Sequence, residues 1–396
     1  MTDPGPLKLV DPADVGMDPD RMARAAARMD EHVASGGTPA ATLVVARHGQ
    51  FVMAHSAGEA RPGGPALNVH HIFPIASQTK PFTSAVVLAL VERGLIGLNE
   101  SVALHLPELA DDHRDVLVAH LLTHTSGWHG DDIDAESAAT LDQLIASIPA
   151  GTDPLTHILL APGWNVARRC EPSQLMQYCS WGYDALGEIV RRVTGDTLDA
   201  AMHRYVFEPV EMASSTLIGR DDLEPRVVKR PPGIPLGPDH DDSPLDFNDD
   251  LLWLCDSGGM GGFASAPDLV RFGQMVLDRG KVGDRRVLSD ASIEAITTNR
   301  IPGIPFEALG VKLPEGSWSY GFSVMGHNRI PKFGGGIAHP ATLRHGGLGG
   351  TSAWLDPTTG VSAAYLEMAT EIDDDRISRS WIAPQIEAMV AASVLD

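Results

Sequence analysis

The chain is poor in cysteine and in basic side chains, and both shortages exclude classes of protein. Its three cysteines, Cys170, Cys179 and Cys255, lack the Cys-x-x-Cys spacing of a zinc site. Because their number is odd, we expect free thiols in a reducing compartment. The chain has 30 basic and 52 acidic residues, a net charge of −22, so it lacks the basic face that binding to nucleic acid requires.

Long apolar runs and several common motifs are also missing. No run reaches the length of a membrane span, and residues 1–11 lack the basic and apolar parts of a signal peptide. We therefore expect a cytoplasmic protein without a membrane partner. No Gly-x-Ser-x-Gly elbow of an α/β-hydrolase occurs. The glycine clusters at 258–262 and 346–350 lack the spacing of a phosphate loop, so we expect no nucleotide and no other cofactor. None of these features specifies the oligomeric state.

Both ends of the chain have the patterns of β-strands. Apolar and β-branched runs predict a hairpin of two strands, at 40–47 and 51–55. After residue 315, Gly-rich or Asp-Pro turns separate further short runs. These runs predict strands at 318–325, 341–345, 351–355 and 361–366.

Helical patterns fill the middle of the chain and both flanks. Apolar residues at helical spacing predict helices at 18–35, from Ser77 to about residue 94, at 115–123, 138–148, 173–194, 197–204, 266–280 and 289–298, and at 377–393. Strands at both ends with helices between them predict an α/β protein of the α+β type with one antiparallel sheet. We expect residues 1–74 and 310–396 to form the sheet domain, with a mainly helical domain, 75–309, inserted. The active site would lie between the two domains.

The stretch 219–257 is rich in Asp and Pro and is too long for a plain connection. We expect an ordered functional loop that forms one wall of a pocket.

A serine and a lysine lie three residues apart where an apolar run meets a helix, at Ser77 and Lys80. On a helix such residues share a face, so the amine can reach the hydroxyl and place a base beside a weak nucleophile. The alternative is that Ser77 caps the helix and Lys80 lies on the surface.

Two later stretches complete a pattern with this pair. The first contains Tyr178, Ser180 and Trp181, and the second is Arg344-His345-Gly346-Gly347-Leu348. In order, the three stretches resemble the motifs of the serine β-lactamase and penicillin-binding-protein superfamily. The branch that they resemble most holds class C β-lactamases and family VIII carboxylesterases. The resemblance covers about residues 17–390 and includes the passages 120–127, 258–269 and 350–357.

The resemblance implies a β-lactamase/transpeptidase-like fold and roles for the motif residues. Ser77 would be the nucleophile, Lys80 its activator and Tyr178 a general acid/base. The N–H groups of Ser77 and Leu348 would form the oxyanion hole. The third motif would lie on an edge strand, where Gly346 and Gly347 let a substrate approach the backbone closely.

Two departures from the family pattern concern the substrate. Ser180 stands where the family usually has Asn, and His345 stands where β-lactamases have Lys. The first change removes an amide that offers both donor and acceptor, which weakens the case for lactam hydrolysis. The second makes the site less cationic, so a free substrate carboxylate is less clearly required. A Tyr-x-Ser motif is similar to that of some hydrolases of linear amides.

Tryptophans near the motifs would suit an apolar acyl or aryl group if they border the active site, although each could instead lie in the core. They are Trp128, Trp164, Trp181, Trp253 and Trp318.

Two clusters could suggest metal ions. His120 and His124 are four apart, with His129, Asp131 and Asp132 following, but they do not form His-Glu-x-x-His and their passage matches a structural element of the family. Residues 373–375, three aspartates, lack the glycine and glutamate of a calcium loop and are typical of a solvated turn. We therefore expect no metal.

Together these features predict a carboxylesterase-like serine hydrolase that acts on a small ester through an acyl-enzyme. Alternatives on the same machinery are an amide or peptide hydrolase, of the D-aminopeptidase or oligoamide type, and an acyltransferase. Weaker alternatives are a β-lactamase and a non-catalytic protein that binds acylated ligands.

Overall fold

The computed structural model describes residues 7–109, 112–149, 153–230, 253–308, 311–327, 336–368 and 382–395. Its α-helices are α1 (Pro19–Ala34), α2 (Thr79–Val91), α3 (Val118–Leu122), α4 (Gly130–Ala146), α5 (Pro154–Asn165), α6 (Trp181–Thr194), α7 (Leu198–Met202), α8 (Glu208–Val210), α10 (Ala266–Leu277), α11 (Asp290–Thr297) and α13 (Ala383–Ala392). No helix of the described residues has the length and apolar character to cross a membrane.

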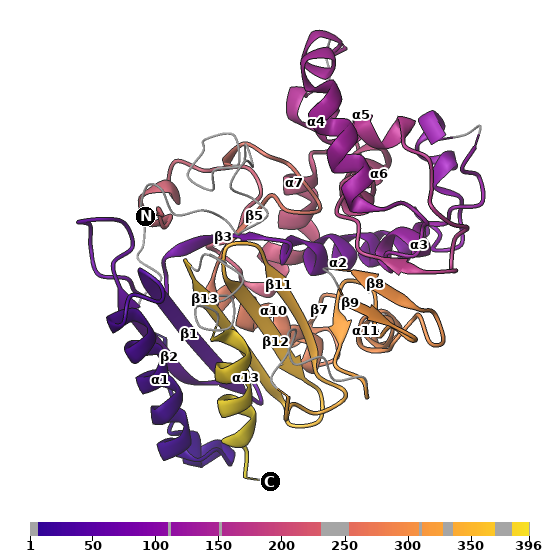
Figure 1. The fold of residues 1–396 in the computed structure, drawn as a ribbon. Coiled ribbons are helices and arrows are strands. Elements are labelled where there is room, and N and C mark those ends of the chain that lie inside the picture. Colours follow the sequence, from indigo (N-terminus) through magenta and orange to yellow (C-terminus); the bar gives the residue numbers. More distant parts are fainter. Residues whose placement is uncertain are drawn as a thin grey trace.

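The strands are β1 (Ala40–Arg47), β2 (Gln50–Gly58), β3 (Ile72–Ala76), β4 (Met176–Gln177), β5 (Gly262–Ser265), β6 (Lys281–Val282), β7 (Arg285–Arg286), β8 (Phe306–Ala308), β9 (Val311–Leu313), β10 (Ser323–Val324), β11 (Leu343–Gly347), β12 (Thr351–Asp356) and β13 (Val361–Glu367). Among the described residues, six of them form the largest sheet in the order β10-β11-β12-β13-β1-β2, antiparallel throughout. This confirms the predicted α+β fold with a sheet built from both chain ends (Figure 1).

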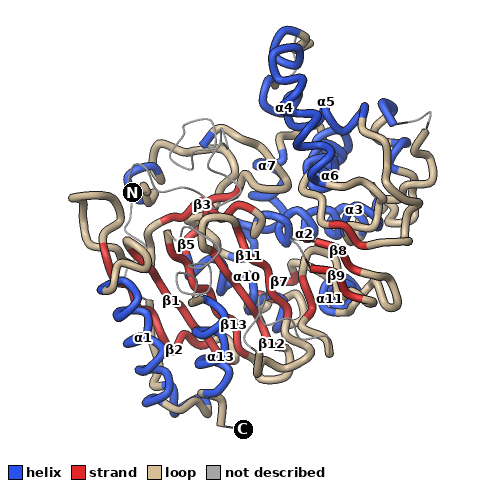
Figure 2. The backbone as a smooth tube through the Cα atoms, in the orientation of Figure 1, coloured by secondary structure: helices blue, strands red, loops and turns tan. Residues whose placement is uncertain are grey.

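Helices cover both faces of this sheet (Figures 1 and 2). Every residue of β1 is buried, because Leu43 and Val45 pack toward α1 and α13 while Val44 packs toward the core on the α10 side. A strand buried on both faces needs a continuous apolar run, which is the pattern of residues 40–47.

Helix α1 shows how sequence sets an element of this fold. The Asp18 side chain accepts hydrogen bonds from the Asp20 and Arg21 N–H groups, and Pro19 occupies the first turn. Such a cap satisfies donors that a helix start leaves unpaired. Met22, Ala25 and Met29 then lie on the buried face.

Several predicted boundaries are wrong. Helix α6 begins at Trp181, not near 173, because the Gln177 N–H donates to the His124 carbonyl and the Met176 N–H to the Pro305 carbonyl, which keeps this segment extended. Helix α4 begins at Gly130, eight residues before the predicted start, with His129 as its cap. The predicted strand 318–325 contains only β10, since Gly321 has a φ of 97° and breaks the extended backbone.

Helix α2 runs between the sheet and the helices α6 and α7 (Figure 1). All residues from Thr79 to Leu90 are buried, as the predicted helix after Ser77 required. The division into domains 1–74 with 310–396 and 75–309 stays a prediction. Residues 231–252 of the predicted loop and 373–375 of the aspartate run lie outside the described residues, as does the start of the helix predicted at 377–393.

Candidate active site

Ser77 lies in the turn between β3 and α2. Strand β3 is held by antiparallel pairing with β5, and Ala76 leaves it with a φ of 43°, in the left-handed region that non-glycine residues rarely adopt. Gln78, not Ser77, is the residue before the first turn of α2, and the helix start has no side-chain cap. The Ser77 hydroxyl is therefore not used for capping, and its residue is half-buried.

The Lys80 amine is fully buried and makes three hydrogen bonds. Its Nζ lies 2.9 Å from the Ser77 Oγ, 3.1 Å from the Ser180 Oγ and 2.8 Å from the Gly259 carbonyl oxygen. The Lys80 amine thus brings together Ser77, Ser180 and Gly259, which are far apart from one another in sequence. An amine held against a serine hydroxyl has the geometry of a base beside its nucleophile.

A buried carboxylate, Asp184, holds the segment that presents the Gly259 carbonyl. Its Oδ1 accepts hydrogen bonds from the Ser257 hydroxyl at 2.5 Å and from the Gly259 N–H at 3.1 Å. Burial raises the pKa of Asp184, although these bonds and the Lys80 charge oppose that change. The fit is close, because a Cβ on Gly258 would lie 2.4 Å from the Tyr183 carbonyl oxygen.

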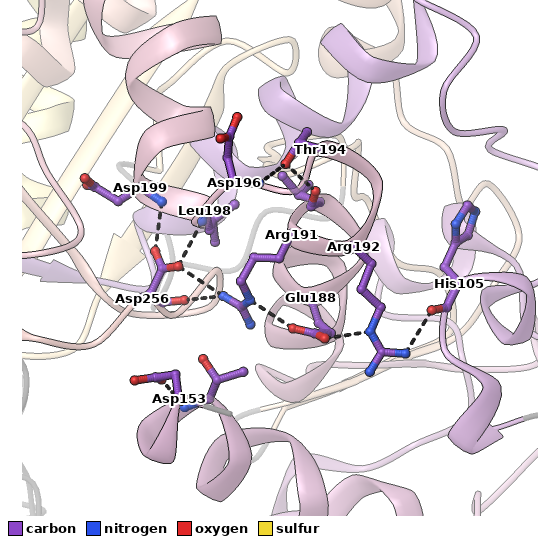
Figure 3. Close-up of polar contacts among 12 residues, drawn as sticks. His105, Asp153, Glu188, Arg191, Arg192, Thr194, Asp196, Leu198, Asp199 and Asp256 are labelled. Carbon is purple, nitrogen blue, oxygen red and sulfur yellow. Dashed lines mark hydrogen bonds and ion pairs between the residues drawn. The ribbon is translucent and has the colours of Figure 1, made fainter. Parts of the chain in front are cut away.

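A second polar network anchors the chain just before this segment (Figure 3). The Asp256 carboxylate accepts hydrogen bonds from the Leu198 and Asp199 N–H groups at the start of α7, both at 2.8 Å. Arg191 on α6 donates to the Asp256 carbonyl oxygen at 2.9 Å and also pairs with Glu188. The turn at 257–259 is therefore fixed to both α6 and α7.

Tyr178 lies beside Lys80 with its ring, not its hydroxyl, toward the amine. The Lys80 Nζ is 4.9 Å from the Tyr178 ring centroid. The ring also packs against His124, at 4.4 Å between centroids, and against Trp318, at 5.9 Å. Within the described part of the chain, the Tyr178 hydroxyl makes no hydrogen bond to Ser77 or Lys80.

His124 fixes the backbone that carries Tyr178 and Ser180. Its Nδ1 accepts a hydrogen bond from the Cys179 N–H at 3.2 Å, so the proton of the neutral ring lies on Nε2. Burial, followed by the Lys80 charge, lowers the pKa of His124 well below its usual range. His124 therefore stays neutral next to Tyr178.

His345 is neutral for the same reason. Burial, followed by the Lys80 charge, lowers its pKa to about 3. Its Nδ1 lies 2.7 Å from the Gly346 carbonyl oxygen. His345, at the position where β-lactamases have lysine, thus adds no positive charge near neutral pH.

The third motif ends beside the serine turn. The prediction that the third motif lies on an edge strand is wrong, because β10 pairs with Leu343 and Arg344 and makes β11 the second strand of the sheet. In the described chain this pairing does not extend to Gly346 and Gly347. A Cβ on Gly347 would lie 2.0 Å from the Ile75 carbonyl oxygen. The end of β11 therefore contacts the backbone of β3 two residues before Ser77. Leu348 is half-buried and packs against the cluster that includes Ala76.

Of the five tryptophans considered from the sequence, three are buried and two are half-buried. Trp181 is 3% exposed, its Nε1 donates to the Leu160 carbonyl oxygen at 3.0 Å, and it packs against Trp128. This placement is that of a core residue, so we leave Trp181 out of the proposed site. Trp318 is buried against Tyr178, whereas Trp253 packs on Phe263 near Leu348.

Trp164 borders a different feature, a cavity of about 440 Å³ lined by residues 112, 113 and 164–171. This cavity does not include Ser77, Lys80 or Tyr178.

The histidine and aspartate residues weighed as metal ligands have structural partners. Asp132 forms a bidentate ion pair with Arg169, and the His129 side chain accepts a hydrogen bond from the Asp131 N–H. The His120 Nδ1 accepts a hydrogen bond from the Leu117 N–H.

Sequence reasoning missed Gly259, Asp184 and the role of His124. Asp184 and His124 have one available signal, a polar residue inside an apolar helical or motif passage. The Gly259 carbonyl has no sequence signal, since backbone oxygens are the same at every residue.

A family model described as Beta-lactamase matches residues 25–382. The chain belongs to this beta-lactamase family. The resemblance and fold class predicted from sequence are thereby confirmed.

Relatives within the beta-lactamase family carry different names. Penicillin-binding protein 4 of Amycolatopsis lactamdurans is 31% identical over 356 residues, 86% of this chain and 82% of the relative. Esterase EstB of Burkholderia gladioli is 29% identical over 382 residues, 87% and 89% of the two chains. A solved penicillin-binding-protein homolog from Caulobacter crescentus has a TM-score of 0.71 at 23% identity and covers 95% of this chain and 98% of its own, which shows a shared fold.

Proposed function

We propose that this protein is a serine hydrolase that cleaves small-molecule esters through an acyl-enzyme on Ser77. The observation that carries the proposal is the buried Lys80 amine, whose Nζ lies 2.9 Å from the Ser77 Oγ. The similarity to Esterase EstB over most of both chains supports an ester as substrate.

The proposed reaction requires the Lys80 amine to give up its extra proton before attack, so that its lone pair faces the Ser77 hydroxyl. The amine takes the Ser77 hydroxyl proton as Oγ attacks the ester carbonyl carbon. The N–H groups of Ser77 and Leu348 would stabilise the charge on the carbonyl oxygen. Collapse breaks the bond to the leaving oxygen, which takes up a proton, and water then cleaves the acyl-enzyme by the reverse transfers. In this proposal Tyr178 acts as a further acid/base, and Gly346 and Gly347 let the substrate lie close to β11.

The neutral state of His345 indicates which substrate charge the site favours. Because His345 adds no cation, the proposed site favours an uncharged ester over a substrate that needs its carboxylate bound. Amide hydrolysis and acyl transfer remain variants of the same acyl-enzyme chemistry.

A second candidate is a protein that reacts with penicillins. The 31% identity to Penicillin-binding protein 4 favours it, and Ser180 in place of the family's Asn weighs against it.

The test uses one panel of substrates on the wild type and on Ser77→Ala. Nitrophenyl acetate and butyrate, a chromogenic cephalosporin and a linear anilide are each assayed with and without an alcohol acceptor. We expect ester hydrolysis that Ser77→Ala abolishes, and labelling of Ser77 by a fluorophosphonate. Ester activity that survives in Ser77→Ala would refute the proposal, whereas cephalosporin turnover faster than ester turnover would favour the second candidate. A ligand bound intact, without labelling of Ser77, would indicate a non-catalytic binder.

A further inference from the structure

The side chain of Ser180 occupies a helix-start position but does not cap the helix. Ser180 precedes the first residue of α6, where a serine hydroxyl commonly accepts a hydrogen bond from the first turn. Here its side chain makes no capping bond, and its Oγ instead lies 3.1 Å from the Lys80 Nζ. The backbone carbonyl of Ser180 still accepts from the Tyr183 N–H at 2.9 Å. The hydroxyl is therefore free of the usual structural role.

The three partners of Lys80 differ in what they can do with a proton. The Gly259 carbonyl oxygen accepts a hydrogen bond but has no proton to give. The Ser77 hydroxyl is the proposed nucleophile. Only the Ser180 hydroxyl can accept a proton from Lys80 and donate its own elsewhere. Tyr178 presents its ring face to the amine at 4.9 Å and does not hydrogen-bond with it.

We propose that the Ser180 hydroxyl is a catalytic proton relay that carries a proton from Lys80 to the leaving oxygen of the substrate. This inference rests on the proposed function and assigns a new role within the same site. The asparagine usual in the family could not serve, because a side-chain amide does not exchange one proton for another in a single transfer at neutral pH.

The relay balances within one acylation cycle. Lys80 becomes an ammonium when it takes the Ser77 proton as the bond from Oγ to the carbonyl carbon forms. As the bond to the leaving oxygen breaks, that oxygen takes the Ser180 proton, and Ser180 takes a proton from Lys80. The alcohol leaves neutral, Ser180 is again a hydroxyl, and Lys80 is again a neutral amine.

A relay matters most for leaving groups that need a proton. Nitrophenolate leaves without protonation, whereas an alkoxide such as ethoxide is far too basic to leave unprotonated. Loss of the relay should therefore affect the ethyl ester far more than the nitrophenyl ester of the same acid. A purely structural effect of the substitution would slow both esters alike.

The test compares variants at Ser180 on nitrophenyl, phenyl and ethyl butyrate, with kcat/KM as the readout because it reports acylation. We expect Ser180→Ala to lower kcat/KM for ethyl butyrate by roughly 100-fold or more, the typical contribution of positioned proton transfer, and for nitrophenyl butyrate by less than about threefold. Ser180→Thr should restore the ethyl ester, and Ser180→Asn should not. Ser84→Ala is the matched control, since Ser84 is a buried serine of α2 whose hydroxyl faces the Tyr183 hydroxyl at 3.3 Å.

Two results would overturn the relay. One is an equal loss on all three esters in Ser180→Ala, and the other is full activity of Ser180→Asn on the ethyl ester. In either case a fluorophosphonate that still labels Ser77 shows that the proposed function stands and only the relay fails. An absence of both labelling and turnover in the wild type would instead refute the proposed function.

Discussion

The Ile75 carbonyl oxygen occupies the space that a side chain on Gly347 would need. A Cβ built on Gly347 would lie 2.0 Å from this oxygen and 2.4 Å from the Thr351 Oγ1. Because Ile75 is backbone of β3 and Gly347 is the last residue of β11, the two segments touch main chain to main chain. This contact positions the third motif beside the Ser77 turn.

Gly347→Ala should therefore separate β11 from β3. We expect a loss of about 1–3 kcal/mol in the free energy of unfolding, the usual cost of forcing extra atoms into a packed site, together with a lower kcat on nitrophenyl esters. Gly346→Ala is the stability control, since its Cβ would meet only the Thr351 carbonyl oxygen at 3.6 Å. Denaturant titration measures the free energy of unfolding of both variants. Equal stability of Gly347→Ala and Gly346→Ala would contradict this reasoning.

Lys80→Met removes the proposed base while keeping an unbranched side chain in the buried position. We expect kcat/KM on nitrophenyl butyrate to fall roughly 10²–10⁴-fold, the usual contribution of an acid/base group, with the fold retained by circular dichroism. Lys312→Met is the control, because Lys312 is 77% exposed and pairs only with Glu307 among the described residues. A folded Lys80→Met enzyme with wild-type rates would rule out Lys80 as the activator.

Asp184 is expected to stabilise the fold through the turn that holds the Gly259 carbonyl. Asp184→Leu leaves the Ser257 hydroxyl without its acceptor, which should cost roughly 1–3 kcal/mol. The Gly259 N–H loses its bond to Asp184 and keeps only the bond to the Ser257 Oγ at 3.2 Å. Asp184→Asn keeps an oxygen in place and should lose less stability. Thermal unfolding of Asp184→Leu and Asp184→Asn measures which variant loses more stability. A Leu variant more stable than the Asn variant would contradict a stabilising role for the Asp184 hydrogen bonds.

The low pKa of His345 predicts a dependence of stability on pH. Its pKa of about 3 in the folded protein is below the ordinary value of 6.5, so between these pH values the unfolded chain binds more protons. The stability from neutral His345 is complete above about pH 6.5 and falls as the pH drops toward 3. As the pH falls from 6.5 to 4, protonation linked to His345 lowers the free energy of unfolding by on the order of 3 kcal/mol.

His345→Gln removes that titrating group. The gap in unfolding free energy between wild type and variant should therefore shift in favour of the variant as the pH falls from 7 to 4. His339→Gln, at an exposed residue, is the control variant. Urea titrations at pH 7 and pH 4 measure this difference in unfolding free energy. A difference that does not change with pH would contradict a buried, neutral His345.

Local sequence patterns predicted much of the sheet. The run at 40–47 has the same bounds as β1, because a strand buried on both faces requires a nearly continuous apolar sequence. The runs at 351–355 and 361–366 match β12 and β13 within a residue at each end. Helix α5 was not predicted, since Pro162 and Gly163 interrupt its pattern although the helix continues through them.

The site was predictable only in part. Ser77 and Lys80 are three residues apart, so local geometry already placed the amine beside the hydroxyl. Gly259 and Ser180 reach Lys80 from 179 and 100 residues away, and only tertiary packing brings them there. Tyr178 likewise reaches Lys80 only through tertiary packing, and its ring rather than its hydroxyl faces the amine.

The most direct test of an acyl-enzyme on Ser77 is mass spectrometry of the protein quenched in acid during turnover of nitrophenyl butyrate. We predict a population whose mass is increased by one butyryl group, with the modification on the peptide that contains Ser77 and absent from Ser77→Ala. Hydrolysis of the ester without any such adduct, or an adduct on another residue with Ser77 unmodified, would contradict the proposed mechanism.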